Sequence, residues 1–379
     1  MRILFLFIGE PHHVFHALPI AAEMAAAGQV IDVAVTSADH LRVVEQVAPA
    51  YPGFSPNTTL LGQKGLPRWL RDMGLFRNPR LPMLFDALPF LRQFDAIVVP
   101  ERTTTSIRHF LPRRTRLIFT PHGAGDRAIM LDPRDRHFDF VLVAGEKSEQ
   151  RLLDAGTIRR GHYAVNGYVK LDLMPRLQAA REPLFANGRP TVLYAPHFKR
   201  ELSSWDSFGR DIIAWFAGQD RYNLIVAPHV RLFAEASDAE RAVVTKLAVP
   251  GKLLIDLGSD RLFDMSYTSG ADIYLGDVSS QVYEFLATPR PCLFLNAHQV
   301  DWADDPDYLF WTLGDVVSDL AELPDALERA PAHHPLYANA QRERLAESIG
   351  GDPAGAARRG AEAILGFLAK NAGQDKSGG

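Results

Sequence analysis

The sequence predicts an α/β protein made of two Rossmann-like domains, and three observations support this. The chain has 379 residues, the length of about two average domains. Short apolar runs alternate with helical segments in both halves, as in the βαβ units of parallel sheets. Breakers cluster at 179–189, where Arg-Glu-Pro and Asn-Gly-Arg-Pro indicate a linker. Two such sheets in tandem place a ligand cleft where the carboxyl ends of their strands face each other, so functional residues are expected directly after strands.

The first domain is expected over residues 1–178. An apolar run at 3–8 leads through a loop rich in Gly, Pro and His into a helix at 17–27, and a second apolar run follows at 30–35. Further strands are predicted at 94–99, 115–119 and 138–143, with a helix at 147–154. This order indicates a parallel sheet that is covered on both faces.

The second domain is expected over residues 190–350. Its helices are predicted at 207–217 and 281–287, and its strands at 191–194, 223–226, 253–256, 273–275 and 292–295. An amphipathic segment at 351–369 is expected to form a C-terminal helix that packs back across the cleft. Residues 370–379 are rich in Lys, Gly and Ser and are expected to form a disordered tail.

Composition excludes several classes of protein. With 41 Lys and Arg against 45 Asp and Glu, the net charge of −4 offers no basic field for nucleic acid. The single cysteine, Cys292, lies in a predicted buried strand, which fits a reducing compartment. The first apolar run is too short for a signal peptide, and no run reaches the roughly 18 apolar residues of a membrane span. We therefore expect a cytoplasmic protein.

A candidate general base follows the predicted strand at 115–119. His122 lies between Pro121 and Gly123 in a strand-end loop, and an imidazole with a pKa near ~6.5 can accept a proton at neutral pH. Gly123 is expected beside it on the acceptor side. The alternative is a histidine that only completes the loop.

Two Ala-Pro-His loops follow strands of the second domain. The loops end in His197 and His229, and each is followed closely by cations: Lys199 and Arg200 in the first loop, Arg231 in the second. Imidazole and guanidinium groups on one rim suit phosphate oxygens. Neutral loop histidines are the alternative.

A third motif follows the predicted strand at 273–275. Asp277, Ser279 and Ser280 precede a helix, and small residues there leave backbone N–H groups open to an anionic oxygen. The serines also suit a simple helix cap, with Glu284 as a capping-box partner. The two interpretations are compatible.

The loop after the first strand is rich in histidine. Glu10, His12, His13 and His16 lie there, but no set of ligands with recognisable metal spacing accompanies them, so no metal is expected. We interpret the loop as the acceptor side of the cleft or as a helix cap. The sequence also lacks GxGxxG, GxSxG and P-loop signatures, and we expect no cofactor.

A basic and apolar segment lies at 64–80. Its apolar residues interleave with five cations and a single acid, Asp72; the cations are Lys64, Arg68, Arg71, Arg77 and Arg80. Such a segment can lie on an anionic membrane or hold a lipid-linked acceptor. The alternative is a helix that packs its apolar face on the core.

The motifs at 121–123, 194–200, 228–229 and 277–285, taken in order, resemble the CDP-glycerol glycerophosphotransferase family of teichoic-acid and capsule-type polymerases. The segment 352–359 is similar to the start of that family's C-terminal helix. The resemblance implies a GT-B fold, with two facing Rossmann-like domains and a cleft between them.

The resemblance also implies roles for individual residues. His122 matches the family's general base and His229 the histidine that contacts the donor phosphate; the residues that match the pyrophosphate site are Ser279 and Ser280, with Asp277 beside them. The chain departs from the family at His197, where Thr is usual, and at Lys199, where Arg is usual.

Taken with these motifs, the resemblance implies a metal-independent transferase of cell-envelope biogenesis, located in the cytoplasm and peripheral to the membrane. It would move glycerol phosphate, or a related phospho-alditol, from CDP-glycerol or a similar donor to a hydroxyl of a lipid-linked or glycan acceptor. A helix dipole and an imidazolium at His229 are expected to offset charge on the leaving nucleotide. Two alternatives stay open: a glycosyltransferase or nucleotide-sugar 2-epimerase that uses a UDP-sugar, and a non-catalytic nucleotide-diphosphate-binding protein of a surface-polymer assembly.

Overall fold

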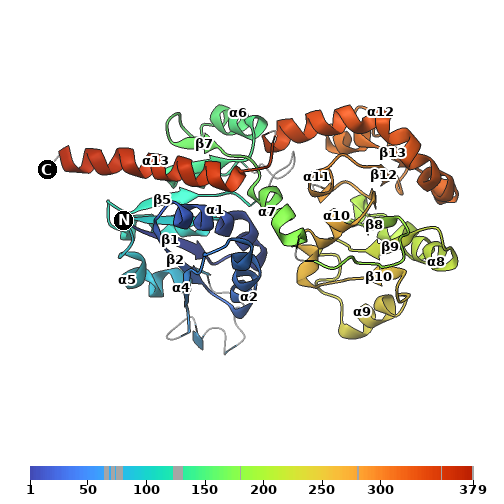
Figure 1. Cartoon of the computed structure of the whole chain (residues 1–379), viewed down its shortest axis with the longest axis horizontal. Coiled ribbons are helices and arrows are strands. Elements are labelled where there is room, and N and C mark those ends of the chain that lie inside the picture. The colour runs from blue at the N-terminus through green and yellow to red at the C-terminus, as the bar shows by residue number, and fades with distance from the viewer. Residues whose placement is uncertain are drawn as a thin grey trace. The chain divides into compact units, whose positions relative to one another are not determined.

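The chain folds into two compact units (Figure 1). The computed structural model describes residues 1–63, 68–69, 73, 80–122, 131–179, 181–279, 281–350 and 352–377. Unit 1 comprises Met1–Leu177 together with Ala346–Gly379, and unit 2 comprises Gln178–Leu345. Gly123, Ser280 and most of the segment 64–80 lie outside the described residues.

Unit 1 contains a seven-stranded parallel sheet with the order β3-β2-β1-β4-β5-β6-β7. The first six strands have the Rossmann order: the strand numbers decrease from β3 to β1 and then increase from β4 onward, while all strands stay parallel. In such sheets ligands bind beside the carboxyl ends of the strands at this point. The strands are β1 (Arg2–Phe7), β2 (Val30–Val35), β3 (Asn57–Leu60), β4 (Ala96–Val99), β5 (Arg116–Phe119), β6 (Phe140–Val143) and β7 (Tyr163–Val165).

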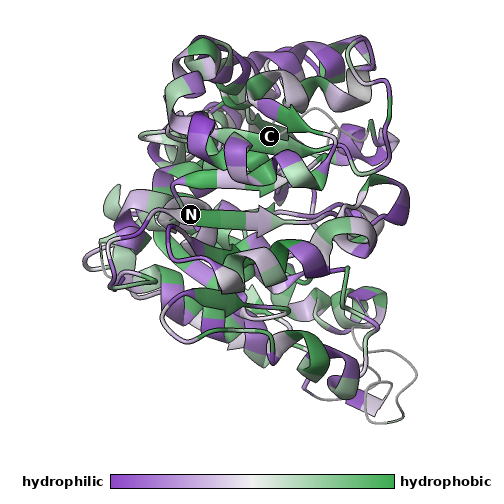
Figure 2. Cartoon of the chain, turned by 90° about the vertical axis from the view of Figure 1, so that its right-hand side faces the viewer, coloured by the Kyte–Doolittle hydropathy of each residue, from purple (hydrophilic) through white to green (hydrophobic). Residues whose placement is uncertain are grey.

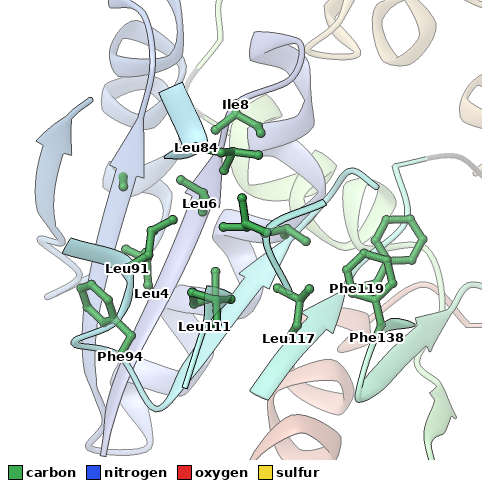
Figure 3. Packing of buried hydrophobic residues seen from close by; sticks show 14 of the residues in the cluster. Leu4, Leu6, Ile8, Leu84, Leu91, Phe94, Leu111, Leu117, Phe119 and Phe138 are labelled. Atoms are coloured by element: carbon green, nitrogen blue, oxygen red, sulfur yellow. The ribbon is translucent and has the colours of Figure 1, made fainter. Parts of the chain in front are cut away.

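Helices cover both faces of this sheet, which explains why most of its strands are largely apolar runs and not alternating patterns. Leu4 and Leu6 of β1, with Ile8 directly after the strand, project into a cluster with Leu117 and Phe119, as Figure 3 shows. The helices are α1 (Val14–Ala26), α2 (Ala38–Val47), α4 (Arg80–Asp86), α5 (Leu88–Leu91), α6 (Glu146–Asp154), α7 (Val169–Gln178) and α13 (Ala356–Ser377); shorter turns are η1 (Pro11–His13), η2 (Ala48–Ala50), η3 (Thr103–Phe110) and η4 (Pro133–His137).

The C-terminal helix α13 is part of unit 1 and lies against α1 (Figure 1). Asp172 fixes its beginning, because the two carboxylate oxygens accept the Gly355 and Ala357 N–H groups at 2.8 and 2.9 Å. A carboxylate at this end also complements the helix dipole. The helix continues to Ser377, beyond the expected start of a disordered tail at residue 370, and the Asn371 side chain bonds back to the Phe367 carbonyl at 2.8 Å.

Unit 2 contains a six-stranded parallel sheet with the same kind of order, β10-β9-β8-β11-β12-β13, which reverses between β8 and β11. Its strands are β8 (Thr191–Ala195), β9 (Asn223–Val226), β10 (Leu253–Ile255), β11 (Ile273–Gly276), β12 (Cys292–Leu295) and β13 (Asp315–Val317). The strands are largely hydrophobic and the helices carry hydrophilic outer faces (Figure 2).

The helices of unit 2 differ from expectation at three places. The predicted helix at 207–217 begins as a π turn and becomes regular at α8, the predicted helix at 281–287 is the short α11, and the long α12 contains Pro331 and Pro335. The helices are α8 (Arg210–Gly218), α9 (Asp238–Thr245), α10 (Ser266–Gly270), α11 (Gln281–Phe285) and α12 (Leu323–Ile349), with turns η5 (Arg200–Leu202), η6 (Trp205–Gly209), η7 (Asp260–Leu262), η8 (Pro306–Leu313) and η9 (Leu320–Glu322).

Two parallel sheets of Rossmann order confirm the predicted α/β class with two Rossmann-like domains. Within the described ranges, no helix has the length and apolar character needed to cross a bilayer.

Candidate functional site

His122 follows β5 in unit 1, and its hydrogen bond fixes which ring nitrogen can act as a base. Its Nδ1 lies 2.6 Å from the Pro100 carbonyl oxygen. Because a carbonyl only accepts, Nδ1 carries the proton and Nε2 carries the lone pair. Burial lowers the pKa of His122, and the charges of Arg102 and Arg80 lower it further, while the bond to Pro100 and the charge of Glu10 oppose this. At neutral pH the ring is therefore an uncharged proton acceptor.

The histidines of the front loop surround His122. The His13 ring stacks on it, with centroids 3.8 Å apart and planes at 23°, and the His16 ring lies 6.4 Å away. The His12 ring in turn meets His13 edge-on at 4.7 Å. Burial holds the pKa of both His13 and His16 well below the usual value, and neighbouring positive charges add to the effect. Among the described residues, no three His, Cys, Asp or Glu side chains are placed to hold a metal.

Glu101 is a buried carboxyl that the sequence analysis missed. It lies two residues after the end of β4 and is only 5% exposed. One oxygen, Oε1, accepts the Thr104 hydroxyl at 3.3 Å, whereas Oε2 is buried without a partner. Burial raises the pKa of Glu101 to about 8, against the charge of Arg80 and the two hydrogen bonds from Thr104 and the Ile8 backbone, so the carboxyl is protonated at neutral pH. A glutamate directly after a buried run was the sequence signal.

Glu10, predicted on the acceptor side, is exposed and pairs with Arg80. Its Oε1 lies 2.9 Å from an Arg80 guanidinium nitrogen. This ion pair lies at the edge of the histidine cluster and engages one of the two cations that act on His122.

In unit 2, three neighbouring strands bring their predicted residues together. His229 follows β9, His197 follows β8 and Asp277 follows β11, and these strands are adjacent in the sheet. The His197 and His229 rings lie 5.7 Å apart, and both touch the Phe198 ring, at 4.7 and 4.5 Å between centroids. The Arg231 guanidinium carbon lies 5.4 Å from the centre of the Phe198 ring. The rim of two imidazoles and one guanidinium is thus a single cluster.

The two imidazoles of this cluster present the opposite group to that of His122. Nδ1 of His197 accepts the Lys199 N–H at 3.1 Å, and Nδ1 of His229 accepts the Arg231 N–H at 3.2 Å. In the neutral rings the proton must then lie on Nε2, which becomes a hydrogen-bond donor. Burial, together with the charge of Arg231, lowers the pKa of His229 to about 4. Before a ligand binds, His229 offers an N–H group and not the imidazolium that the sequence analysis expected.

Asp277 holds the His197 loop in place. It is fully buried, and its Oδ2 accepts the backbone N–H groups of His197 at 2.8 Å and Ser204 at 2.9 Å. Burial raises the pKa of Asp277 to about 6, although these hydrogen bonds oppose the rise. Oδ1 is buried without a partner. The carboxyl therefore positions the loop at the strand-order reversal between β8 and β11.

Ser279 behaves as a helix cap. Its Oγ accepts the Gln281 N–H at 3.3 Å, and the helix that follows, α11, has only five residues. So short a helix adds little dipole, which weakens the expected phosphate cradle at this place. Glu284 lies on the same helix and is partly exposed. The second predicted serine, Ser280, lies outside the described residues.

The cations of the first Ala-Pro-His loop point to solvent. Lys199 and Arg200 are both exposed, and Arg200 pairs with Asp206 at 3.3 Å. Exposed ion pairs of this kind contribute little stability, so Arg200 can exchange its partner for a ligand at small cost.

No family model matches the chain, and no curated protein matches it either. Many solved structures are similar. A structure of the wall teichoic acid polymerase TagF matches with a TM-score of 0.67 and 12% identity, over 98% of this chain and 89% of that chain.

Two further similar structures contain uridine diphosphate ligands. UDP-GlcNAc 2-epimerase from Neisseria meningitidis, bound to UDP-GlcNAc, matches with a TM-score of 0.60 and 15% identity, over 97% of this chain and 100% of that chain. The MnaA–UDP co-structure from S. aureus matches with a TM-score of 0.61 and 14% identity, over 97% and 96%. At these identities the likeness shows the fold, and that fold is GT-B, as the sequence analysis predicts.

Proposed function

We propose that the protein transfers glycerol phosphate, or a related phospho-alditol, from CDP-glycerol or a similar nucleotide-diphosphate donor to a hydroxyl of a lipid-linked or glycan acceptor. Unit 1 would bind the acceptor and unit 2 the donor. The TagF polymerase, which has also been soaked with CDPG, shares the fold and supports a donor of this class.

One observation carries the proposal: the histidines have opposite tautomers. His122 presents a lone pair at Nε2, whereas His197 and His229 present N–H groups at Nε2. A lone pair suits a hydroxyl that must lose its proton, and N–H donors suit phosphate oxygens. Group transfer from a diphosphate to an alcohol needs both.

The proposed reaction is a single displacement at phosphorus. The acceptor oxygen forms a bond to the phosphorus that bears glycerol, and the bond from that phosphorus to the bridging oxygen breaks, so CMP leaves with the bridging oxygen. The acceptor proton passes to Nε2 of His122 and then to solvent. His197, His229 and Arg231 would hold the diphosphate and offset charge on the leaving group by hydrogen bonds, and Lys199, Arg200, Ser279 and Ser280 would add contacts.

Contact with an anionic membrane is part of this proposal, carried by the segment 64–80. Its alternating basic and apolar residues suit the surface of a bilayer that holds a lipid-linked acceptor. Sedimentation with anionic vesicles tests it: replacement of Arg68, Arg71 and Arg77 by Glu should abolish co-sedimentation, and unchanged co-sedimentation rejects it.

A UDP-sugar epimerase or glycosyltransferase is the second candidate, because the N. meningitidis epimerase matches 97% of this chain, against 98% for TagF. Product analysis separates the two. The full chain is incubated with CDP-glycerol and, separately, with UDP-N-acetylglucosamine. CMP release supports the proposal; UDP release or an epimerised sugar supports the alternative. Donor binding by calorimetry with no product from any acceptor indicates a non-catalytic binding protein.

A further inference from the structure

The histidine cluster of unit 1 contains two buried polar atoms that have no partner and that lie over the same glycine. They are Oε2 of Glu101 and Nδ1 of His13, and both side chains are 5% exposed. A Cβ atom built on Gly9 would lie 2.7 Å from the first and 2.6 Å from the second. The two atoms therefore converge at the carboxyl ends of β1 and β4, where the strand order reverses.

We propose that Gly9, His13 and Glu101 form a subsite for an uncharged hydroxyl group, so that the acceptor enters unit 1 as an alcohol (a polyol or a sugar) and not as a phosphate. This rests on the proposed function, because it names the acceptor chemistry beside His122. Glu101 and His13 act here by binding and orienting the acceptor.

The position of the subsite suits an acceptor that reacts at His122. The His13 ring stacks directly on the His122 ring, and Pro100, whose carbonyl orients His122, is the residue before Glu101. A polyol carries several hydroxyls on neighbouring carbons. One held by Glu101 and His13 would leave the next within the same region as Nε2 of His122.

The chemistry of the two atoms selects a hydroxyl. Burial keeps the Glu101 carboxyl protonated at neutral pH, so it can donate, and a neutral imidazole nitrogen can accept. A hydroxyl can accept from the first and donate to the second, which satisfies both. An anion would lose its hydration without gaining a charge partner, because the two cations that act on His13, Glu101 and His122 are engaged. Arg80 pairs with Glu10 at 2.9 Å, and Arg102 binds Asp135 at 2.6 and 3.0 Å.

Binding of an uncharged polyol by the full chain tests the subsite. The probes are ribitol and glycerol, followed by saturation-transfer NMR, with inorganic phosphate as competitor. Wild-type protein should bind ribitol, and phosphate should not displace it. Glu101→Gln keeps a neutral group that can donate and accept hydrogen bonds. Its dissociation constant for ribitol should lie within about threefold of the wild-type value. In Glu101→Leu the side chain has a similar size but no polar atom. This variant should bind ribitol about tenfold more weakly than wild type, because one hydrogen bond is lost.

A second measurement protects the test against misfolding. In wild type, ribitol should shift the infrared C=O band of a protonated carboxyl, and this band should be absent in Glu101→Gln. The matched control is Glu23→Gln, which changes a carboxyl on α1 that pairs with Arg176 and should bind ribitol as wild type does.

The outcomes separate this inference from the proposed function. Ribitol binding that Glu101→Leu weakens supports the subsite even if CDP-glycerol yields no product. CMP release with an acceptor KM that is equal in wild type and both Glu101 variants overturns the subsite and leaves the proposed function standing. Absence of polyol binding by wild type, or no shift of the carboxyl band, means that the two atoms hold only water and also overturns it.

Discussion

The substitutions His122→Asn and His229→Asn should each remove one chemical function of the histidine and preserve the loop that holds it. The asparagine amide occupies roughly the place of Nδ1. At His122 its N–H can keep the bond to Pro100, and at His229 its oxygen can keep the bond from the Arg231 N–H. Each substitution therefore deletes Nε2 alone: a proton acceptor at His122 and a hydrogen-bond donor at His229.

The expected loss of activity differs in size between the two positions, and glutamine should restore activity at His229 but not at His122. Loss of a general base should lower kcat about 10²- to 10⁴-fold, in His122→Asn and in His122→Gln, because no amide accepts a proton at neutral pH. A hydrogen bond to a charged group is worth about 1.5–3 kcal/mol, so His229→Asn should cost about 10- to 150-fold. Glutamine places an N–H near the position of Nε2, so His229→Gln should retain activity within about tenfold of wild type.

The assay is CMP release from CDP-glycerol with donor and acceptor saturating, and thermal melts check that each variant is folded. His122→Asn with turnover within tenfold of wild type would refute the base assignment. Equal impairment of His229→Gln and His229→Asn would refute the donor assignment, since only glutamine retains a donor.

Three further predictions concern stability and packing. Burial lowers the pKa of His40 from 6.5 to about 4. The free energy of unfolding should therefore fall as the pH drops, by about 2 kcal/mol between about pH 7 and 5, because the unfolded chain takes up a proton at His40 that the folded chain does not. Urea unfolding of His40→Leu should lack this part of the pH dependence. Asp277→Ala leaves two buried N–H groups unpaired and should lower the unfolding free energy by about 2–5 kcal/mol, whereas Asp277→Asn should retain most of it; equal losses in denaturation would contradict this. Gly9→Ala places a Cβ 2.6 Å from His13 and should cost about 1–3 kcal/mol; the control Gly366→Ala, with open space around it, should be neutral or stabilising in the same melts.

The fold was predictable where burial dominates the sequence pattern. The run that became β12 is apolar over its whole length, and β1, β2 and β9 carry one polar residue each, Arg2, Asp32 and Asn223. The ends of these four strands were predicted to within two residues. Short edge strands such as β3 and β13 bury fewer residues and give no such signal. The long helix α12 was not anticipated because Pro331 and Pro335 interrupt the pattern that marks a helix.

The candidate site was predictable in its residue types and not in its chemistry. Placement after strands was enough to select His122, His197, His229 and Asp277. Which ring nitrogen carries a proton depends on hydrogen bonds to backbone groups that only the folded loops bring near. The role of Glu101 depends on burial, which a single charged letter after a strand does not reveal.

Measurement of the tautomers of His122, His197 and His229 is the most direct test, because the proposed chemistry depends on which ring nitrogen carries the proton. Two-bond ¹H–¹⁵N correlation spectra of the ¹⁵N-histidine-labelled full chain, recorded at about pH 7.5 and assigned with single asparagine variants, report the protonated nitrogen of each ring. We predict a proton on Nδ1 of His122 and on Nε2 of both His197 and His229. A proton on Nε2 of His122, or a His229 ring that is charged or protonated on Nδ1, would contradict the roles proposed for these histidines.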